Sequence, residues 1–380
     1  MTDSSGVSDS TSQRPHVAAR LEDRAYGLVG RWLARRGWQP RVEAYTGYAG
    51  AGWVRVMART VLAPPGTRPA EVAEKDPGSS ERAVRGWRSF LTAAVPHALV
   101  RVDVGGRQQD VRADRGGYVD AVLEAQLEPG WRQVHLTLGG ATAAAPVLVV
   151  PPGPGRALVS DIDDTAMVTA LPRPLLAAWN SFVLHEHARR PVPGMAGLYR
   201  RWSAAHPQAP TFYLSTGAWN VAPALRRFLE RHGYPAGPLL LTDWGPTNTG
   251  WFRSGREHKM RSLRRLLAEF PETTWVLVGD DGQHDPQIYA DIAAEHPGRV
   301  EVIAIRQLSP AEQVLAHGTP VPTRDGGPPT GAAPRPGSGV GTGAWDPGRT
   351  PGGGTTATVT GGDGNALALA LIDRGLLPAR

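Results

Sequence analysis

Residues 151–155 read Pro-Pro-Gly-Pro-Gly and divide the chain into two parts of different pattern. After this break, short apolar runs alternate with longer amphipathic stretches. Strand-like runs lie at 156–160, 211–214, 239–241, 275–278 and 300–305, and helix-like stretches at 225–232, 260–270 and 286–294. This alternation predicts an α/β fold with a Rossmann-like parallel sheet and helices on both faces, within a unit spanning 151–310.

The part before the break has strand patterns but no catalytic constellation. Its clearest run spans 53–62, and alternating runs follow at 98–104 and 133–138. We therefore predict a mostly β accessory domain within 16–150, which begins with an amphipathic helix at 16–38. Residues 1–15 are rich in Ser, Thr and Asp and are predicted to be a disordered lead-in.

Gly, Pro and Thr dominate the chain from about residue 317, and apolar residues become scarce. Such a segment cannot repay the entropy that ordering costs, so 311–380 is predicted to be a disordered tail. Its last stretch, 366–377, is apolar again. We interpret that stretch as a frayed end, with a short docking helix as the alternative.

Composition excludes several classes of site. The chain of 380 residues has no cysteine, which rules out disulfides, thiolate metal sites and cysteine catalysis. Its net charge of +6 moderately favours anionic substrates or surfaces, and no nucleic acid partner is expected. No apolar run approaches the ~20 residues of a spanning helix. With no secretory pattern at 1–15, a cytoplasmic location is expected.

Paired carboxylates provide the first chemical signal. Asp161 and Asp163 directly follow the apolar run 157–159, and ligands in open α/β sheets bind at the carboxyl ends of strands. One carboxylate can attack phosphorus while the other handles the proton of the leaving group. A calcium loop is the alternative, but Met167 and Val168 do not supply the further oxygen ligands that it needs.

Polar groups after later runs extend this signal. Ser215, Thr216 and Gly217 follow the second strand-like run and can donate hydrogen bonds to a phosphoryl oxygen. Lys259 begins an amphipathic helical pattern and can neutralise phosphate charge.

Acidic residues also follow the run 275–278, at Asp280, Asp281 and Asp285. Beside Asp161 they would form an oxygen site suited to Mg²⁺, and a turn with capping aspartates is the alternative. The order of these features along the chain indicates a single site more strongly than any one of them.

This set resembles the haloacid dehalogenase superfamily of phosphatases and, more narrowly, the catalytic domain family of the actin patch type of phosphatidate phosphatase, as a bacterial member. The resemblance covers about 155–310 and rests on strings at 160–165, 193–199, 213–220, 258–259 and 279–289. One departure is Ser-Thr-Gly-Ala-Trp-Asn at 215–220, where the family pattern has a proline before Trp-Asn. The missing proline leaves the loop shape and the substrate choice open.

The resemblance implies hydrolysis of a phosphomonoester through an aspartyl phosphate. Asp161 would be the nucleophile and Asp163 the general acid and base. Mg²⁺ would be held by Asp161, the backbone carbonyl of Asp163 and Asp280, with either Asp281 or Asp285 as a further ligand.

Substrate contacts are implied in the same way. Ser215 and Lys259 would bind the phosphoryl oxygens, with Thr165, Thr216 and Gly217 as further substrate-binding positions.

Three functions remain open from the sequence. The first is hydrolysis of phosphatidate or a related lipid phosphate, the second is hydrolysis of a soluble metabolite at the same site, and the third is a binding or scaffold protein with a weak site. The helix at 16–38, with arginines beside an apolar face and Trp32, suits peripheral contact with an anionic membrane. Packing of that helix against the β domain is the alternative.

Overall fold

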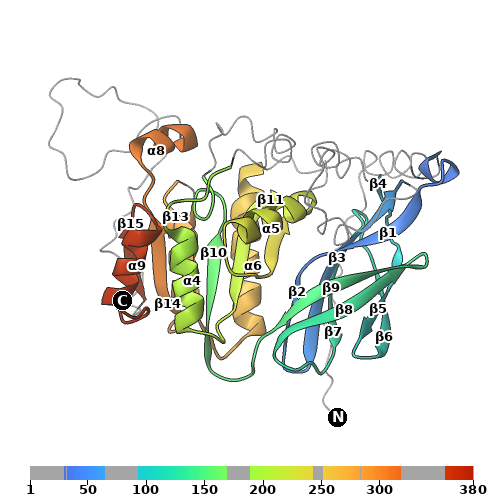
Figure 1. The fold of residues 1–380 in the computed structure, drawn as a ribbon, viewed down its shortest axis with the longest axis horizontal. Coiled ribbons are helices and arrows are strands. Elements are labelled where there is room, and N and C mark those ends of the chain that lie inside the picture. Colours follow the sequence, from blue (N-terminus) through green and yellow to red (C-terminus); the bar gives the residue numbers. More distant parts are fainter. Residues whose placement is uncertain are drawn as a thin grey trace, which may run out of the picture.

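A computed structural model describes residues 30, 32–64, 93–168, 189–242, 251–282, 284–317 and 356–379 of the chain. Within these residues the chain forms two sheets, one mostly antiparallel and one parallel (Figure 1). The predicted lead-in at 1–15 lies outside the described residues, as does most of the predicted helix at 16–38.

The first sheet has nine strands among the described residues. In order across the sheet they are β1 (Gln39–Ala44), β3 (Trp53–Ala63), β2 (Gly47–Gly50), β9 (Ala141–Val149), β8 (Gly130–Leu138), β5 (Leu99–Val104) and β6 (Arg107–Arg112), while β4 (Ala93–Ala94) and β7 (Tyr118–Glu124) also pair with β3. Small β-branched and alanine side chains fill its core, among them Val54, Val102 and Val134. The predicted mostly β domain is thus present.

The second sheet is entirely parallel, as the alternating pattern predicts. Its order is β12 (Leu239–Thr242), β11 (Thr211–Ala218), β10 (Gly155–Asp161), β13 (Thr273–Asp280), β14 (Val300–Arg306) and β15 (Ala357–Gly361). The central strands are buried on both faces, so their runs are continuously apolar.

Helices cover both faces of this sheet. They are α4 (Met195–Ala205), α5 (Ala222–Arg231), α6 (Trp251–Glu269), α7 (Asp285–Glu295), α8 (Pro310–His317) and α9 (Gly364–Asp373), with a short 3₁₀ turn η5 (Trp219–Val221). Ser160 of β10 contacts Tyr199 of α4, whereas Phe212, paired with the neighbouring Val159, contacts Phe270 just after α6. Successive strand residues point to opposite faces, so α4 and α6 lie on opposite sides.

The C-terminal part corrects the predicted tail. Residues 356–379 are ordered into β15, which pairs with β14 in parallel, and α9, which packs beside α4 (Figure 1). Leu367, Leu371 and Leu377 belong to the main hydrophobic core. The apolar stretch at 366–377 is therefore a docked helix and the turn after it, because its leucines cover the end of the sheet. Residues 318–355 lie outside the described part.

The two sheets share one core through aromatic side chains. The ring of Tyr48 in β2 lies edge-on to that of Phe212 in β11, with 5.4 Å between their centroids. The Tyr48 hydroxyl donates to Glu269 at the end of α6 at 2.8 Å, and Arg55 of β3 pairs with the same carboxylate. The accessory domain is therefore packed against the α/β unit.

The described end of the 16–38 segment is helical over 32–35. Leu33 is buried, whereas Trp32 is 51% exposed and lies under the guanidinium of Arg36, 3.7 Å from its ring centroid. Among the described residues, no helix combines the length and the apolar character needed to cross a membrane.

Candidate active site

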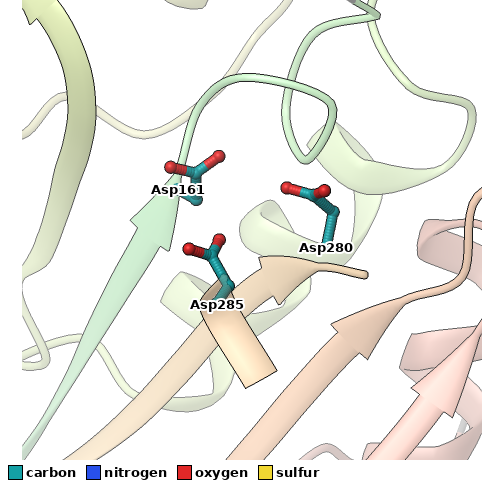
Figure 2. Close-up of side chains that lie close together, drawn as sticks. All are labelled: Asp161, Asp280 and Asp285. Atoms are coloured by element: carbon teal, nitrogen blue, oxygen red, sulfur yellow. The ribbon is translucent and has the colours of Figure 1, made fainter. Parts of the chain in front are cut away.

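The carboxyl ends of β10, β11 and β13 bring the predicted residues together. β10 lies between β11 and β13 in a parallel sheet, so Asp161, Ser215 and Asp280 come to one edge. Figure 2 shows the carboxylates of Asp161 and Asp280 converging with that of Asp285, the first residue of α7. Each of these side chains is buried.

The loop after β10 folds into a tight turn. The carbonyl of Ile162 accepts hydrogen bonds from the amides of Ala166 and Met167, each at 3.0 Å, and Asp164 N–H donates to the Met167 carbonyl at 2.8 Å. Asp164 has a left-handed backbone with φ of 58°, a conformation that aspartate tolerates better than most residues. This turn directs Asp163 and Thr165 back towards the end of the sheet.

Lys259 joins two of the three carboxylates. Its Nζ lies 2.6 Å from Asp161 Oδ1 and 2.6 Å from Asp285 Oδ1. The sequence predicts Lys259 at the start of a helix, but α6 begins at Trp251, so the lysine lies in its third turn. Burial alone would lower the pKa of Lys259, but the negative charges of Asp161 and Asp285 outweigh it and raise that pKa above its usual value.

Burial raises the pKa values of Asp161 and Asp280. The pKa of Asp161 is raised first by burial, with Lys259 acting against the rise, and Asp285 and Asp280 adding to it. The pKa of Asp280 is raised by burial and then by the charge of Asp285. Three buried carboxyl groups therefore share one ammonium group, and a further cation would favour their ionised forms.

Asp163 and Ser215 form a second pair. Ser215 Oγ donates to Asp163 Oδ2 at 2.8 Å and accepts from the amide of Gly217 at 3.0 Å. Burial raises the pKa of Asp163, and the bond from Ser215 opposes that rise. The raised pKa favours a protonated carboxyl, the form that can donate a proton.

Thr165 and the turn after β13 hold Asp280 in place. Thr165 Oγ1 donates to Asp280 Oδ2 at 3.3 Å, and the amide of Gly282 donates to Asp280 Oδ1 at 2.7 Å. Thr165 is fully buried and its hydroxyl points to this carboxylate. We assign it to orienting Asp280.

The structure places Asp281 and Asp285, the two alternatives for the further metal ligand, in different surroundings. Asp285 lies in the cluster, where a carboxylate oxygen from each of Asp161, Asp280 and Asp285 falls within 4.8 Å of the others. Asp281 instead accepts a hydrogen bond from the Leu308 amide through Oδ1 at 2.8 Å. This bond joins Asp281 to a segment 27 residues further along the chain, whereas Asp280 Oδ1 accepts from Gly282 within the turn itself.

Gly279 is necessary for this cluster. A Cβ atom at this position would lie 2.5 Å from Asp285 Oδ2 and 2.8 Å from the Tyr289 ring. The glycine before Asp280 therefore leaves the space in which Asp285 approaches Asp161.

The end of β11 and the turn η5 after it also contact other segments, η5 the accessory domain. The Trp219 ring stacks on Tyr45 with 4.5 Å between centroids and 18° between planes. The backbone carbonyls of Thr216 and Gly217 accept from Thr242 Oγ1 at 3.0 and 3.1 Å. These contacts fix the Ser-Thr-Gly-Ala-Trp-Asn segment, which lacks the proline of the family pattern.

Sequence reasoning missed two arginines near the site. Arg189 lies close enough to Asp163 for its charge to lower the pKa of that group, and Arg306 donates to the Asp164 carbonyl at 2.6 Å. Arg306 ends β14, so the rule that ligands gather at the carboxyl ends of strands could have found it. Arg189 follows a segment outside the described residues, and no local pattern marks it.

Part of the chain is similar to known proteins. Residues 156–307 match the family described as the catalytic domain of phosphatidate phosphatase APP1. Phosphatidate phosphatase APP1 of Saccharomyces cerevisiae is 25% identical over 240 residues, which cover 58% of this chain and 40% of the yeast protein. An uncharacterized Schizosaccharomyces pombe protein is 25% identical over 155 residues, which cover 40% of this chain and 25% of that protein.

Among solved structures, the chain is similar to the HAD domain of effector protein Lem4 from Legionella pneumophila. It is 16% identical with a TM-score of 0.28, and covers 41% of this chain and 86% of that domain. The chain spans less than half of the length of the two fungal relatives. Residues 156–307, which form most of the parallel sheet with the carboxylates at the ends of its strands, are thus similar to the catalytic domain of phosphatidate phosphatase APP1.

Proposed function

We propose that this chain is a Mg²⁺-dependent phosphomonoester hydrolase that works through an aspartyl phosphate on Asp161. One observation carries the proposal: a buried carboxylate at a strand end lies 2.6 Å from a buried lysine and shares its surroundings with two further carboxylates. This arrangement supplies a nucleophile and a phosphate-binding cation. It also leaves excess negative charge that suits a divalent cation.

The carboxylate cluster fits Mg²⁺. Asp161 Oδ2 and Asp285 Oδ2 are buried, with no hydrogen-bond partner among the described residues, and only oxygen ligands converge there. Oxygen ligands of this kind are the ones that Mg²⁺ prefers. Asp161, Asp280 and Asp285 would hold the ion, together with the backbone carbonyl of Asp163. When bound, Mg²⁺ offsets the repulsion between an anionic nucleophile and an anionic phosphoryl group.

Hydrolysis then follows in two displacements. A carboxylate oxygen of Asp161 forms a bond to phosphorus, the bond to the leaving oxygen breaks, and Asp163 donates its proton to that oxygen. Asp163 next accepts a proton from a water molecule that attacks phosphorus. The P–O bond to Asp161 breaks and inorganic phosphate is released, which restores the free carboxylate.

Lys259 and the last residues of β11 would bind the phosphoryl oxygens. Lys259 carries a full positive charge beside Asp161, and a charged donor in a dry site strongly stabilises charge that develops on phosphate. Ser215 lies within hydrogen-bonding distance of Asp163. Its hydroxyl can turn from Asp163 to a phosphoryl oxygen, and Thr216 and Gly217 follow it at the same end of β11.

We propose phosphatidate or a related lipid phosphate as the substrate, since the yeast relative is named a phosphatidate phosphatase. The exposed Trp32 with its stacked Arg36 would contribute a membrane-facing aromatic and a cation. Hydrolysis of a soluble phosphomonoester at the same site is the second candidate. A binding or scaffold role with a weak site is disfavoured, because every chemical position is occupied.

The primary test compares Asp161→Asn with Asp281→Asn. The first removes the nucleophile and should abolish Mg²⁺-dependent release of phosphate from p-nitrophenyl phosphate. The second alters an adjacent aspartate that bonds to Leu308 and should retain activity. Full turnover by Asp161→Asn would refute the mechanism, and equal loss in both variants would refute the placement of the metal site.

The substrate class is tested separately. Wild-type protein with Mg²⁺ is assayed against phosphatidate in vesicles and against a panel of soluble phosphomonoesters at equal phosphate concentration. A higher kcat/KM on vesicles supports the lipid proposal. Activity on soluble esters alone, with no sedimentation on anionic vesicles, would favour the soluble-metabolite alternative and remove the membrane role of 16–38.

A further inference from the structure

Arg306 contacts three segments of the chain, one of which is the loop that follows Asp161. It is the last residue of β14 and is buried, and its backbone pairs with that of Asp280 on one side and Gly361 on the other. It therefore lies at the same edge of the sheet as the carboxylates. Neither the nucleophilic nor the acid–base role of the proposed mechanism uses it.

Each nitrogen that Arg306 uses goes to a different segment. Nη1 donates to the Asp164 carbonyl at 2.6 Å, Nη2 to Glu312 of α8 at 2.6 Å, and Nε to the Gly362 carbonyl at 3.4 Å. A planar guanidinium offers its donors in a fixed fork, so these three contacts set the position of the segments relative to one another. Lysine could not reproduce the set.

The Asp164 carbonyl is the contact that matters for catalysis. Asp164 lies between Asp163 and Thr165 in a left-handed conformation, and such residues persist only where surrounding groups hold them. A charge-assisted bond to its carbonyl fixes the orientation of the peptide that follows. That peptide leads to Thr165, which orients Asp280.

The C-terminal segment completes this arrangement. Gly362 follows β15, and two residues later the amide of Gly364 donates to the Pro193 carbonyl at 2.9 Å, just before α4. Backbones approach closely there, because a Cβ on Gly364 would lie 2.2 Å from Met195 N. The turn at 362–364 therefore lies between Arg306 and the start of α4, although it falls outside the segment 156–307 that matches the family.

We propose that Arg306 is a positioning residue for the loop at 162–167, which follows Asp161 and is here called the nucleophile loop. We further propose that the C-terminal β15–α9 segment supports Arg306 and is part of the catalytic unit. Loss of the fork frees the Asp164 carbonyl and lets Asp163 and Thr165 move relative to Asp161 and Asp280. Small displacements of reacting groups lower kcat steeply, while binding of a small ester changes little.

The test uses Arg306→Ala with Arg299→Ala as its matched control. Arg299 also donates to three backbone carbonyls, those of Thr273, Phe270 and Leu267, but at the opposite end of the sheet. Arg306→Ala should lower kcat on p-nitrophenyl phosphate by about 10- to 100-fold with KM within about 3-fold of wild type. Arg299→Ala should keep kcat, even if its melting temperature falls as far.

A second readout does not depend on activity. The amides of Ala166 and Met167 are held by the Ile162 carbonyl within the loop. Hydrogen exchange of a peptide covering 161–168, measured by mass spectrometry, should accelerate about tenfold or more in Arg306→Ala and not in Arg299→Ala. The kinetic readout rests on the proposed function, whereas the exchange readout stands if the wild type proves inactive.

Arg306→Lys covers the case in which the alanine variant does not fold. A lysine retains the charge but donates from a single nitrogen, so kcat and the exchange rate should lie between those of the wild type and those of Arg306→Ala. Added guanidinium ion at low millimolar concentration should partly restore kcat in Arg306→Ala and leave Arg299→Ala unchanged. Wild-type kcat and exchange in either Arg306 variant, or an equal kcat loss in Arg299→Ala, would overturn the proposal.

Discussion

Replacement of Leu371 by alanine tests whether the C-terminal helix is part of the folded body. Leu371 lies in α9 with 0% of its surface exposed, within the core that also contains the strands of the parallel sheet. Leu369, two residues earlier in the same helix, is 63% exposed. The two leucines therefore share a helix and differ in burial, which makes Leu369→Ala the matched control.

The expected loss follows from the cavity that the substitution leaves. Leu→Ala at a fully buried site costs ~2–5 kcal/mol, whereas the same change on an exposed helix face stays within ~0.5 kcal/mol, because alanine is at least as good a helix former. In a unit of this size the buried change should lower the melting temperature by roughly 5–15 °C.

Urea unfolding followed by far-ultraviolet circular dichroism measures both variants. Leu371→Ala should shift the midpoint to lower urea without a change in the slope, and Leu369→Ala should overlay the wild type. A disordered tail, as the Gly/Pro-rich composition predicts, would leave both variants unchanged. Equal midpoints for Leu371→Ala and the wild type would therefore refute the docking of α9.

Three further changes test the site and its support. Tyr45→Ala removes the ring that stacks on Trp219 and should lower kcat/KM by about tenfold, whereas Tyr45→Phe keeps the ring and should not. A kcat/KM of Tyr45→Ala equal to that of the wild type would show that this contact with the accessory domain does not affect catalysis. Gly279→Ala places a Cβ 2.5 Å from Asp285 Oδ2 and should weaken Mg²⁺ activation by about tenfold or more, a result that an unchanged Mg²⁺ titration would contradict. Burial lowers the pKa of His258 to about 4 from its ordinary 6.5, so on acidification the unfolded chain binds a proton before the folded protein does. The free energy of unfolding should therefore fall by on the order of 3 kcal/mol as the pH drops from 6.5 towards 4. Unfolding curves of His258→Gln should lack this part of the pH dependence, and parallel profiles for both proteins would contradict the assignment.

Local sequence patterns predict the central strands of the parallel sheet and the carboxylates at their ends. The apolar runs before Asp161 and Asp280 marked central strands, and the carboxylates at their ends came together because parallel strands end at one edge. The helical pattern that follows Lys259 is visible from Met260 onward, but the sequence does not show that α6 begins at Trp251.

Contacts between distant segments decided what the sequence could not. Asp281 and Asp285 follow the same strand, and their contacts with distant segments separate them: Asp281 accepts from the Leu308 amide, whereas Asp285 pairs with Lys259. β15 was missed because its residues, Ala-Thr-Val-Thr-Gly, are weakly apolar and follow a long Gly/Pro-rich stretch. A strand of this kind becomes favourable only when β14 is present beside it. Because β14 ends at Arg306 and β15 begins at Ala357, a local stretch of sequence does not include both strands.

The physical need for β15 and α9 follows from the strand that they cover. β14 is buried along nearly its whole length, with Val302, Ile303 and Ile305 in the core. If the folded unit ended at residue 307, where the family match ends, this strand would be a long apolar edge with unpaired backbone groups. β15 pairs with it from Val302 to Arg306, and Leu367 and Leu371 of α9 bury its neighbouring face. Arg306 ends the same strand and bonds to the Asp164 carbonyl in the loop after β10. One set of contacts therefore both covers the outer side of β14 and holds that loop.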